Sequence, residues 1–214
     1  MVRVKICGIT RKEDALAAMK AGVHALGLVF HPESPRFIAP YQAKEMIVSL
    51  PPLVSWVGVF VNQCVEVVLE TARQVGLDTI QLHGEESPKA CQYCLEKGFR
   101  VVKAIRVASD EDLKAVEKYR GVVSAILLDT RVTGKYGGTG RTFPWKLALQ
   151  VKDIPIILAG GLNPENVAQA IAEVHPWGVD VSSGVETTPG IKDPMLIGKL
   201  MDSILKRRTK EKGP

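Results

Sequence analysis

The chain lacks a long apolar run, and none of its apolar stretches approaches the roughly 20 residues that cross a bilayer. It also lacks the pattern of a secretory signal peptide, because its first residues enter a short strand-like run, residues 2–7, at once. These two absences exclude an integral membrane protein of the helical kind. We therefore expect a cytoplasmic protein with no membrane partner.

Cysteine is scarce, with four residues in a chain of 214. Cys91 and Cys94 have the spacing of a redox or zinc pair, but they fall inside a predicted helix, residues 88–97. No second pair of this kind and no nearby histidine pair completes a zinc site. We expect reduced thiols, no bound metal, and a packing role for Cys91 and Cys94.

Aromatic residues are also few, at 6% of the chain, whereas the net charge is +5. Part of the positive charge lies in residues 206–214, where no aromatic side chain is interleaved to stack on bases. A nucleic-acid partner is therefore not expected, and the net positive charge would attract a small anionic substrate. Because no linker interrupts the chain, we expect one domain over residues 1–205 and a frayed basic tail over residues 206–214.

Eight short apolar runs alternate with helical stretches along the chain. Most of the runs are continuous rather than alternating, which is typical of parallel strands covered on both faces. The alternation predicts an α/β fold, a single (β/α)8 TIM barrel of parallel strands. A doubly wound open sheet is the alternative, and the strand count favours the barrel. The predicted strands are residues 2–7, 25–30, 55–61, 79–82, 100–106, 125–129, 155–159 and 178–181.

Helices are predicted between these strands, and several have recognisable first residues. Ser109 is a suitable N-cap for one of them, and Pro164 and Pro194 are suited to the first helical position of two others. The predicted helices include residues 13–21, 41–50, 65–75, 88–97, 110–119 and 195–206.

The active site of such a barrel lies at the carboxyl ends of the strands. Cys7 ends the first predicted strand, where a thiol can serve as a base or a nucleophile, although a small buried hydrophobe is the alternative. Asp129 ends the sixth strand, where a carboxyl group is either a catalytic acid or base or a loop cap. His83 ends the fourth strand and is expected to stabilise a turn.

Two loops have the composition of a phosphate site. Gly160 and Gly161 follow the seventh strand, and Ser182, Ser183 and Gly184 follow the eighth. Barrels that bind phosphorylated substrates bind the phosphate there, through main-chain N–H groups and a short extra helix, which we expect within residues 186–191. The alternative is that these glycines only form tight turns.

Two further loops are candidate substrate contacts. Arg36 lies in a loop stiffened by Pro32 and Pro35, where its guanidinium can bind a carboxylate in bidentate fashion, or can simply be solvated. Residues 130–142 contain four glycines and are expected to form a mobile lid. They are not a nucleotide P-loop, because the spacing of that motif would need glycine at position 135 and lysine at position 141.

Seven segments together resemble the phosphoribosylanthranilate isomerases of tryptophan biosynthesis, in the order of that family and over nearly the whole chain. Two positions depart from the family pattern, Glu33 and Pro144, and both lie away from Cys7 and Asp129 in the sequence. The segments are Lys5-Ile6-Cys7-Gly8-Ile9-Thr10, Ser34-Pro35-Arg36, Gln81-Leu82-His83-Gly84, Leu128-Asp129-Thr130, Gly137-Gly138-Thr139-Gly140-Arg141-Thr142-Phe143, Leu158-Ala159-Gly160-Gly161-Leu162 and Asp180-Val181-Ser182-Ser183-Gly184-Val185-Glu186.

The resemblance implies a cofactor-independent Amadori rearrangement, in which N-(5-phosphoribosyl)anthranilate becomes 1-(2-carboxyphenylamino)-1-deoxyribulose 5-phosphate. It implies that Cys7 is the general base, Asp129 the general acid and Arg36 the ligand of the anthranilate carboxylate. The phosphate would lie between Gly160-Gly161 and Ser182-Ser183-Gly184. Members of the family occur as monomers and homodimers, so the resemblance leaves the oligomeric state open.

Two other functions are compatible with much of this pattern. The first is the related aldose–ketose isomerisation of histidine biosynthesis, alone or with dual specificity, but that reaction is expected to pair two aspartates and Cys7 stands in place of one. The second is a non-catalytic barrel that binds a phosphorylated ligand. We also expect Lys5, two residues before Cys7, to share its strand face and to favour the thiolate.

Overall fold

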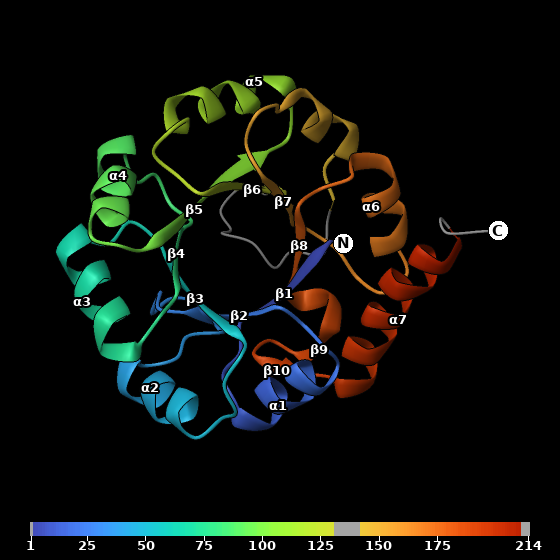
Figure 1. Cartoon of the computed structure of the whole chain (residues 1–214), viewed down its shortest axis with the longest axis horizontal. Helices are drawn as coiled ribbons and strands as arrows, with labels where there is room; N and C mark the ends of the chain where they lie inside the picture. Colours follow the sequence, from blue (N-terminus) through green and yellow to red (C-terminus); the bar gives the residue numbers. More distant parts are fainter. Residues whose placement is uncertain (1, 131–141, 211–214) are drawn as a thin grey trace.

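A closed ring of eight parallel strands forms the centre of the protein (Figure 1). The computed structural model describes residues 2–130 and 142–210, and for residues 206–210 it describes the main chain alone. The ring closes where β1 pairs with both β2 and β8. The predicted barrel is confirmed, and each predicted strand is present with ends that shift by at most one residue. The strands are β1 (Arg3–Cys7), β2 (Ala25–Val29), β3 (Ser55–Phe60), β4 (Thr79–Leu82), β5 (Arg100–Val107), β6 (Ala125–Thr130), β7 (Ile156–Leu158) and β8 (Gly178–Val181).

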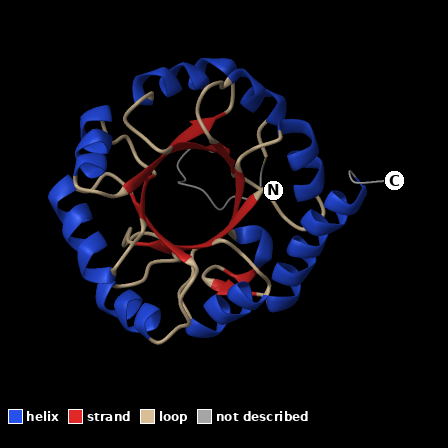
Figure 2. Ribbon diagram, viewed as in Figure 1, coloured by secondary structure: helices blue, strands red, loops and turns tan. Residues whose placement is uncertain are grey.

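Helices surround the strand ring on all sides (Figure 2). The first of them begin and end within two residues of their predicted positions. No described helix is long and apolar enough to cross a membrane. The α-helices are α1 (Lys12–Lys20), α2 (Pro40–Val48), α3 (Val65–Val75), α4 (Pro88–Glu96), α5 (Asp110–Leu113), α6 (Val167–Val174) and α7 (Pro194–Lys210), and the 3-10 helices are η1 (Lys114–Tyr119), η2 (Trp145–Gln150) and η3 (Ser183–Val185).

Three elements differ from the predictions. The helix expected over residues 110–119 is divided into α5 and η1. Helix α6 begins at Val167 rather than at Pro164, because the Asn163 side chain accepts hydrogen bonds from the main-chain N–H groups of Glu165 and Asn166 and holds a turn there. Helix α7 continues to Lys210, four residues beyond its predicted end.

The short helix expected within residues 186–191 is absent, and this prediction was wrong. Those residues instead begin an antiparallel hairpin of β9 (Glu186–Thr188) and β10 (Ile191–Lys192). The hairpin turns at Pro189-Gly190, where Gly190 has a φ of 85°, a conformation that glycine adopts without strain. The short helix of this region is η3, which comes directly before the hairpin.

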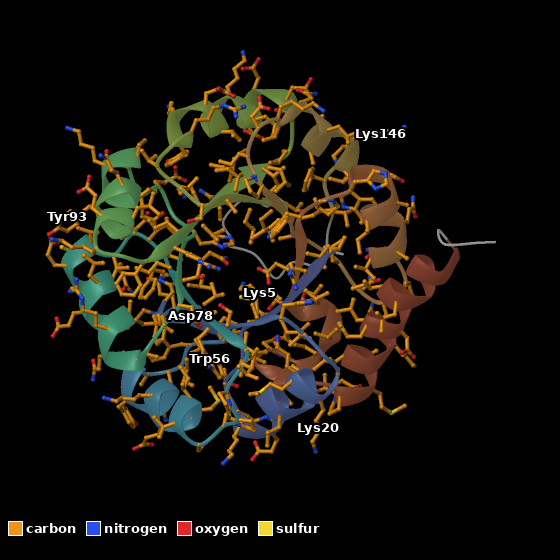
Figure 3. The ribbon with its side chains drawn as sticks, in the orientation of Figure 1. Lys5, Lys20, Trp56, Asp78, Tyr93 and Lys146 are labelled. Atoms are coloured by element: carbon orange, nitrogen blue, oxygen red, sulfur yellow. The ribbon has the colours of Figure 1, made fainter. Side chains whose placement is uncertain are left out.

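The main apolar core lies between the strand ring and the helices, and a smaller one fills the ring. Because side chains alternate along a strand, Val4 and Ile6 of β1 join the outer core, whereas Lys5 and Cys7 point into the ring. Figure 3 shows Lys5 inside the ring, far from the outer positions of Lys20 and Tyr93. The ring interior therefore contains a charged group, Lys5, in addition to apolar side chains.

Candidate active site

The carboxyl ends of the strands surround a cavity of about 90 Å³. Its lining brings together all of the predicted site residues except Gly184, which lies beside the cavity in η3. His83 and Asp180 also line it. The residues 131–141, expected to form most of a lid, lie outside the described part of the chain. The predicted residues that line the cavity are Cys7, Arg36, Asp129, Gly160, Gly161, Ser182 and Ser183.

The Cys7 thiol lies buried at the end of β1 and packs against Val29 and Val59. The neighbouring strand leaves room for it through Gly27, where a Cβ atom would lie 2.8 Å from the sulfur. Burial raises the pKa of the Cys7 thiol, and the positive charge of Lys5 acts in the opposite direction without cancelling the effect. Cys7 is thus a buried thiol with a cation close by.

Lys5 and Asp180 form an ion pair inside the barrel, with 2.8 Å between Nζ and Oδ2. Burial lowers the pKa of Lys5, but the charges of Asp180 and Cys7 outweigh it, so that the pKa of Lys5 lies above its ordinary value. Lys5 is therefore a permanent cation at neutral pH. The predicted proximity of Lys5 and Cys7 is consistent with these interactions. The second oxygen of Asp180, Oδ1, has no hydrogen-bond partner among the described residues.

Asp129 is held at the end of β6 by two contacts. Its Oδ1 accepts a hydrogen bond of 2.8 Å from the main-chain N–H of Thr130, and its Oδ2 lies 3.2 Å from His83 Nε2. Gln81 Nε2 donates to His83 Nδ1 across 2.9 Å, so the proton of a neutral His83 resides on Nε2 and is directed at Asp129. His83 thus contacts the predicted acid, a role that the sequence analysis did not assign to it.

Gly160 brings the loop after β7 against Asp129. Its φ is +84°, and a Cβ atom there would lie 2.2 Å from Thr130 Oγ1 and 2.9 Å from Asp129 Oδ1. A larger residue would be strained by both its backbone conformation and this close approach. The loop that follows is shaped by Asn166, whose Nδ2 donates to the Gly161 carbonyl across 2.9 Å.

Gly161 and Ser183, from the last two loops, both line the cavity. Among the described residues, neither the main-chain N–H of Gly161 nor the hydroxyl of Ser183 has an acceptor. The hydroxyl of Ser182, in contrast, donates to the Cys7 carbonyl across 3.1 Å and so ties the loop after β8 to the end of β1. Unpaired N–H and O–H donors at this edge are suited to an anion.

Arg36 reaches the cavity across Gly8, where a Cβ atom would lie 2.5 Å from Arg36 Cδ. Its guanidinium forms a bidentate ion pair with Glu186, through Nε to Oε1 at 2.9 Å and Nη2 to Oε2 at 2.7 Å. Glu186 also contacts Lys192 Nζ at 2.7 Å. Sequence reasoning did not assign a role to Glu186 or Lys192, although Glu186 ends one of the segments on which the resemblance rests.

Comparison with known proteins gives a consistent result. Residues 4–203 match the family model described as N-(5'phosphoribosyl)anthranilate (PRA) isomerase. The enzyme of that name from Citrifermentans bemidjiense is 52% identical over 202 residues, 94% of this chain and 96% of the relative. The one from Pelobacter propionicus is 50% identical over 198 residues, 92% of each chain.

Solved structures agree with this match. Phosphoribosyl anthranilate isomerase from Thermotoga maritima superimposes with a TM-score of 0.89 at 45% identity, covering 96% of this chain and all of that one. A second such enzyme, solved with reduced 1-(o-carboxyphenylamino)-1-deoxyribulose 5-phosphate, has a TM-score of 0.87 at 44% identity and the same coverage. The chain therefore belongs to the N-(5'-phosphoribosyl)anthranilate isomerase family.

Proposed function

We propose that this enzyme converts N-(5-phosphoribosyl)anthranilate to 1-(2-carboxyphenylamino)-1-deoxyribulose 5-phosphate in tryptophan biosynthesis, without a cofactor. The observation that carries the proposal is the cavity in which a thiol, a carboxyl group, a guanidinium and unpaired N–H and O–H donors meet. A related enzyme was solved with a reduced form of this product, which supports the substrate class. All four cysteines are free, in keeping with a cytoplasmic location.

The two halves of the reaction need two different groups. Opening of the ribose ring requires a proton on the ring oxygen, which Asp129 in its protonated form donates. The resulting Schiff base acidifies the hydrogen at C2, and the Cys7 thiolate removes that proton to give an enolamine. The enolamine becomes the ketone when its hydroxyl loses a proton and C1 gains one. No bond to the Cys7 sulfur forms at any step.

The remaining site residues bind the two anionic ends of the substrate. Arg36 binds the anthranilate carboxylate, because its planar guanidinium matches a carboxylate in geometry and charge. Gly160, Gly161, Ser183 and Gly184 form the phosphate site together with the main chain of Ser182, and the N–H of Gly161 and the hydroxyl of Ser183 are among its free donors.

Loss of the anthranilate fluorescence of the substrate tests the proposed function. We expect the wild-type protein to consume N-(5-phosphoribosyl)anthranilate, and to consume the analogue without the phosphate much more slowly, because that analogue cannot use the two last loops. No loss of fluorescence above the spontaneous rate would contradict the proposed function. Equal rates for the two compounds would contradict the phosphate site.

Replacing Lys5 by methionine should shift the pH dependence of the reaction. Cys7 acts as a base only when it is deprotonated, so kcat/KM rises with pH as the thiol loses its proton. Because the charge of Lys5 lowers the pKa of Cys7, its removal raises that pKa and moves the rising limb to higher pH. The measurement is kcat/KM between pH 6 and 10 for both proteins, and an unmoved limb would show that Lys5 does not assist Cys7.

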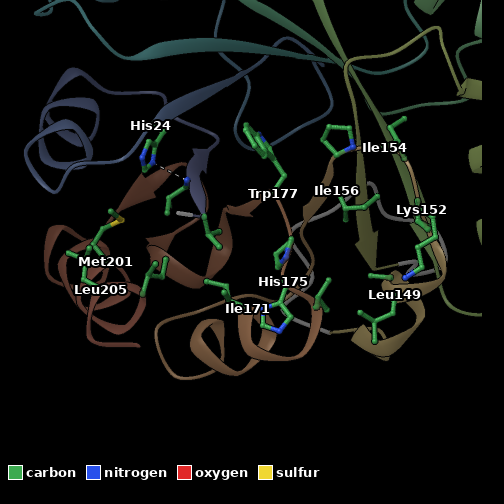
Figure 4. A pocket seen from close by; sticks show the side chains of 18 residues that line it. His24, Leu149, Lys152, Ile154, Ile156, Ile171, His175, Trp177, Met201 and Leu205 are labelled. Atoms are coloured by element: carbon green, nitrogen blue, oxygen red, sulfur yellow. Dashed lines mark hydrogen bonds between the residues drawn. The ribbon is translucent and has the colours of Figure 1, made fainter. Parts of the chain in front are cut away.

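We also propose that the protein forms a homodimer through the amino-terminal end of the barrel. A cavity of about 800 Å³ at that end is lined mainly by apolar side chains (Figure 4). Trp177, Leu205 and Leu149 in its lining are each more than two-fifths exposed, and Leu53, in the loop before β3, is fully exposed at a φ of 82°. A solved relative from Thermotoga maritima is described as dimeric. Apolar surface of this kind favours burial against a partner.

Sedimentation equilibrium tests the dimer. We expect the wild-type protein to sediment as a dimer and the Leu53→Glu variant as a monomer, because a carboxylate cannot be buried without a partner. Tyr41→Glu is the matched control, since Tyr41 is an exposed apolar residue at the opposite end of helix α2. A wild-type monomer, or a Leu53→Glu variant that stays dimeric, would contradict the proposed interface.

A further inference from the structure

The hairpin β9–β10, which is not part of the eight-stranded ring, places a lysine in the wall of the active site. Lys192 is the last residue of β10, and its side chain is completely buried. Its main-chain N–H donates to Asp14 Oδ2 across 2.9 Å, which fixes the hairpin to the first turn of α1. A buried ammonium group is costly unless each of its protons has an acceptor.

Each proton of the Lys192 ammonium has an acceptor in the active-site wall. Nζ lies 2.5 Å from the Cys7 carbonyl, 2.7 Å from Glu186 Oε1 and 3.3 Å from the Ser182 carbonyl. These acceptors belong to the end of β1, the start of β9 and the residue that follows β8. One cation therefore joins the residue of the proposed base, the proposed phosphate loop and the partner of Arg36.

Glu186 uses its two oxygens to hold Arg36 in one orientation. Oε1 accepts from Arg36 Nε and from Lys192 Nζ, and Oε2 accepts from Arg36 Nη2. The two carboxylate oxygens of Glu186 thus occupy the edge of the guanidinium that Nε and Nη2 form. The other edge, formed by Nη1 and the second N–H of Nη2, has no acceptor among the described residues, and Arg36 lines the cavity. That edge is free for the bidentate contact that a second carboxylate makes.

Arg36, Glu186 and Lys192 together carry one net positive charge. Arg36 and Lys192 contribute two positive charges and Glu186 one negative charge, all in a largely buried place. Burial lowers the pKa of Lys192, while the charge of Glu186 opposes that change. Burial also raises the pKa of Glu186, but the hydrogen bonds and charges of Arg36 and Lys192 outweigh it and hold that pKa below its ordinary value. This net positive charge favours binding of a carboxylate beside Arg36.

We propose that Glu186 and Lys192 are positioning residues: Glu186 orients Arg36 so that its free edge faces the carboxylate of the substrate, and Lys192 fixes Glu186 to the main chain of Cys7. Arg36, which binds the carboxylate, and Cys7, which removes the proton, are then fixed relative to each other, although neither Glu186 nor Lys192 touches the substrate. The inference rests on the proposed function, because it assigns the substrate carboxylate to Arg36.

A pair of ligands separates this role from a purely structural one. The first ligand is reduced 1-(o-carboxyphenylamino)-1-deoxyribulose 5-phosphate, and the second is the same compound without the carboxylate. Calorimetry of the wild-type protein should show tighter binding of the first. In Glu186→Gln we expect the ratio of the two affinities to fall by about 10-fold or more, with little change for the second ligand, because only the carboxylate contact depends on the orientation of Arg36.

Lys192→Met gives a second, kinetic readout. We expect kcat/KM to fall by about 100-fold through both kcat and KM, because Cys7 and Arg36 lose their common support. The rising limb of the pH profile should also move to higher pH. The charged groups that act on Cys7 are Lys5 of β1, Asp180 of β8 and Lys192 of β10, and removal of Lys192 leaves one cation fewer.

Thr187→Ala is the control for the hairpin, because Thr187 is exposed on β9 and, among the described residues, its hydroxyl bonds to Ile191 of the same hairpin. It should keep the wild-type affinity ratio and rate. If the wild type turns over the substrate but Glu186→Gln keeps the wild-type affinity ratio, the positioning role is wrong while the proposed function stands. If Lys192→Met does not fold, the Glu186→Gln result alone decides. A wild type with no preference for the carboxylate overturns both the positioning role and the assignment of the substrate carboxylate to Arg36, whereas a wild type without turnover overturns the proposed function.

Discussion

Replacing Cys7 by serine should lower kcat/KM by about 10²- to 10⁴-fold, the range that a positioned general base contributes. Serine has nearly the same shape, and the hydroxyl is a far weaker acid than the thiol, so it is not deprotonated at neutral pH. The sulfur packs against Val29 and Val59, and its replacement removes little apolar contact. Steady-state loss of substrate fluorescence measures the effect.

Binding and mass measurements complete this prediction. Cys7→Ser should bind the reduced product with nearly the wild-type affinity, and Cys64→Ser, which changes an exposed thiol, should keep full activity. The wild-type protein, quenched during turnover, should have an unmodified mass, because a base forms no bond to the substrate. Full activity of Cys7→Ser, or a substrate adduct on the sulfur, would exclude the role of a general base.

Replacing Asp129 by asparagine should have a comparable effect, a fall in kcat/KM of about 10²- to 10⁴-fold. The amide oxygen still accepts the hydrogen bond from the Thr130 N–H, so this contact at the end of β6 is kept. The amide has no acidic proton for the ring oxygen, and ring opening becomes the slow step. The rate is again measured from the loss of substrate fluorescence.

Asp78→Asn is the matched control for this change. Asp78 also accepts a main-chain hydrogen bond, of 2.6 Å from the Trp56 N–H, but it lies just before β4 and therefore at the amino-terminal end of the barrel, away from the site. It should keep the wild-type rate. An Asp129→Asn variant as fast as Asp78→Asn would show that the acid is another group.

The strand ring could be predicted closely from the sequence because its strands are buried on both faces. Such strands appear as continuous apolar runs, and in a closed barrel their carboxyl ends meet at one end. That topology alone was sufficient to bring Cys7, Asp129 and the two glycine- and serine-containing loops together. The start of α6 was missed because a side chain, Asn163, captures the N–H groups of the turn before it.

The contacts between distant residues could not be predicted in the same way. Arg36 and Glu186 are 150 residues apart, and nothing in their local sequence indicates that they pair. Likewise His83 meets Asp129 only because β4 and β6 end at the same side of the ring. The hairpin differs from the helix that phosphate-binding barrels lead one to expect within residues 186–191, because Pro189-Gly190 favours a turn.

The central claim is that Cys7 removes the proton from C2 of the opened sugar. The most direct test compares single-turnover loss of fluorescence for the ordinary substrate and for substrate with deuterium at C2. The comparison is carried out on the wild type and on Cys7→Ser. The pH is low enough that little of Cys7 is thiolate, so that proton abstraction limits the rate. We predict that deuterium slows the wild type and that Cys7→Ser is slow with either substrate. Equal rates for the two substrates, with Cys7→Ser as fast as the wild type, would contradict the claim.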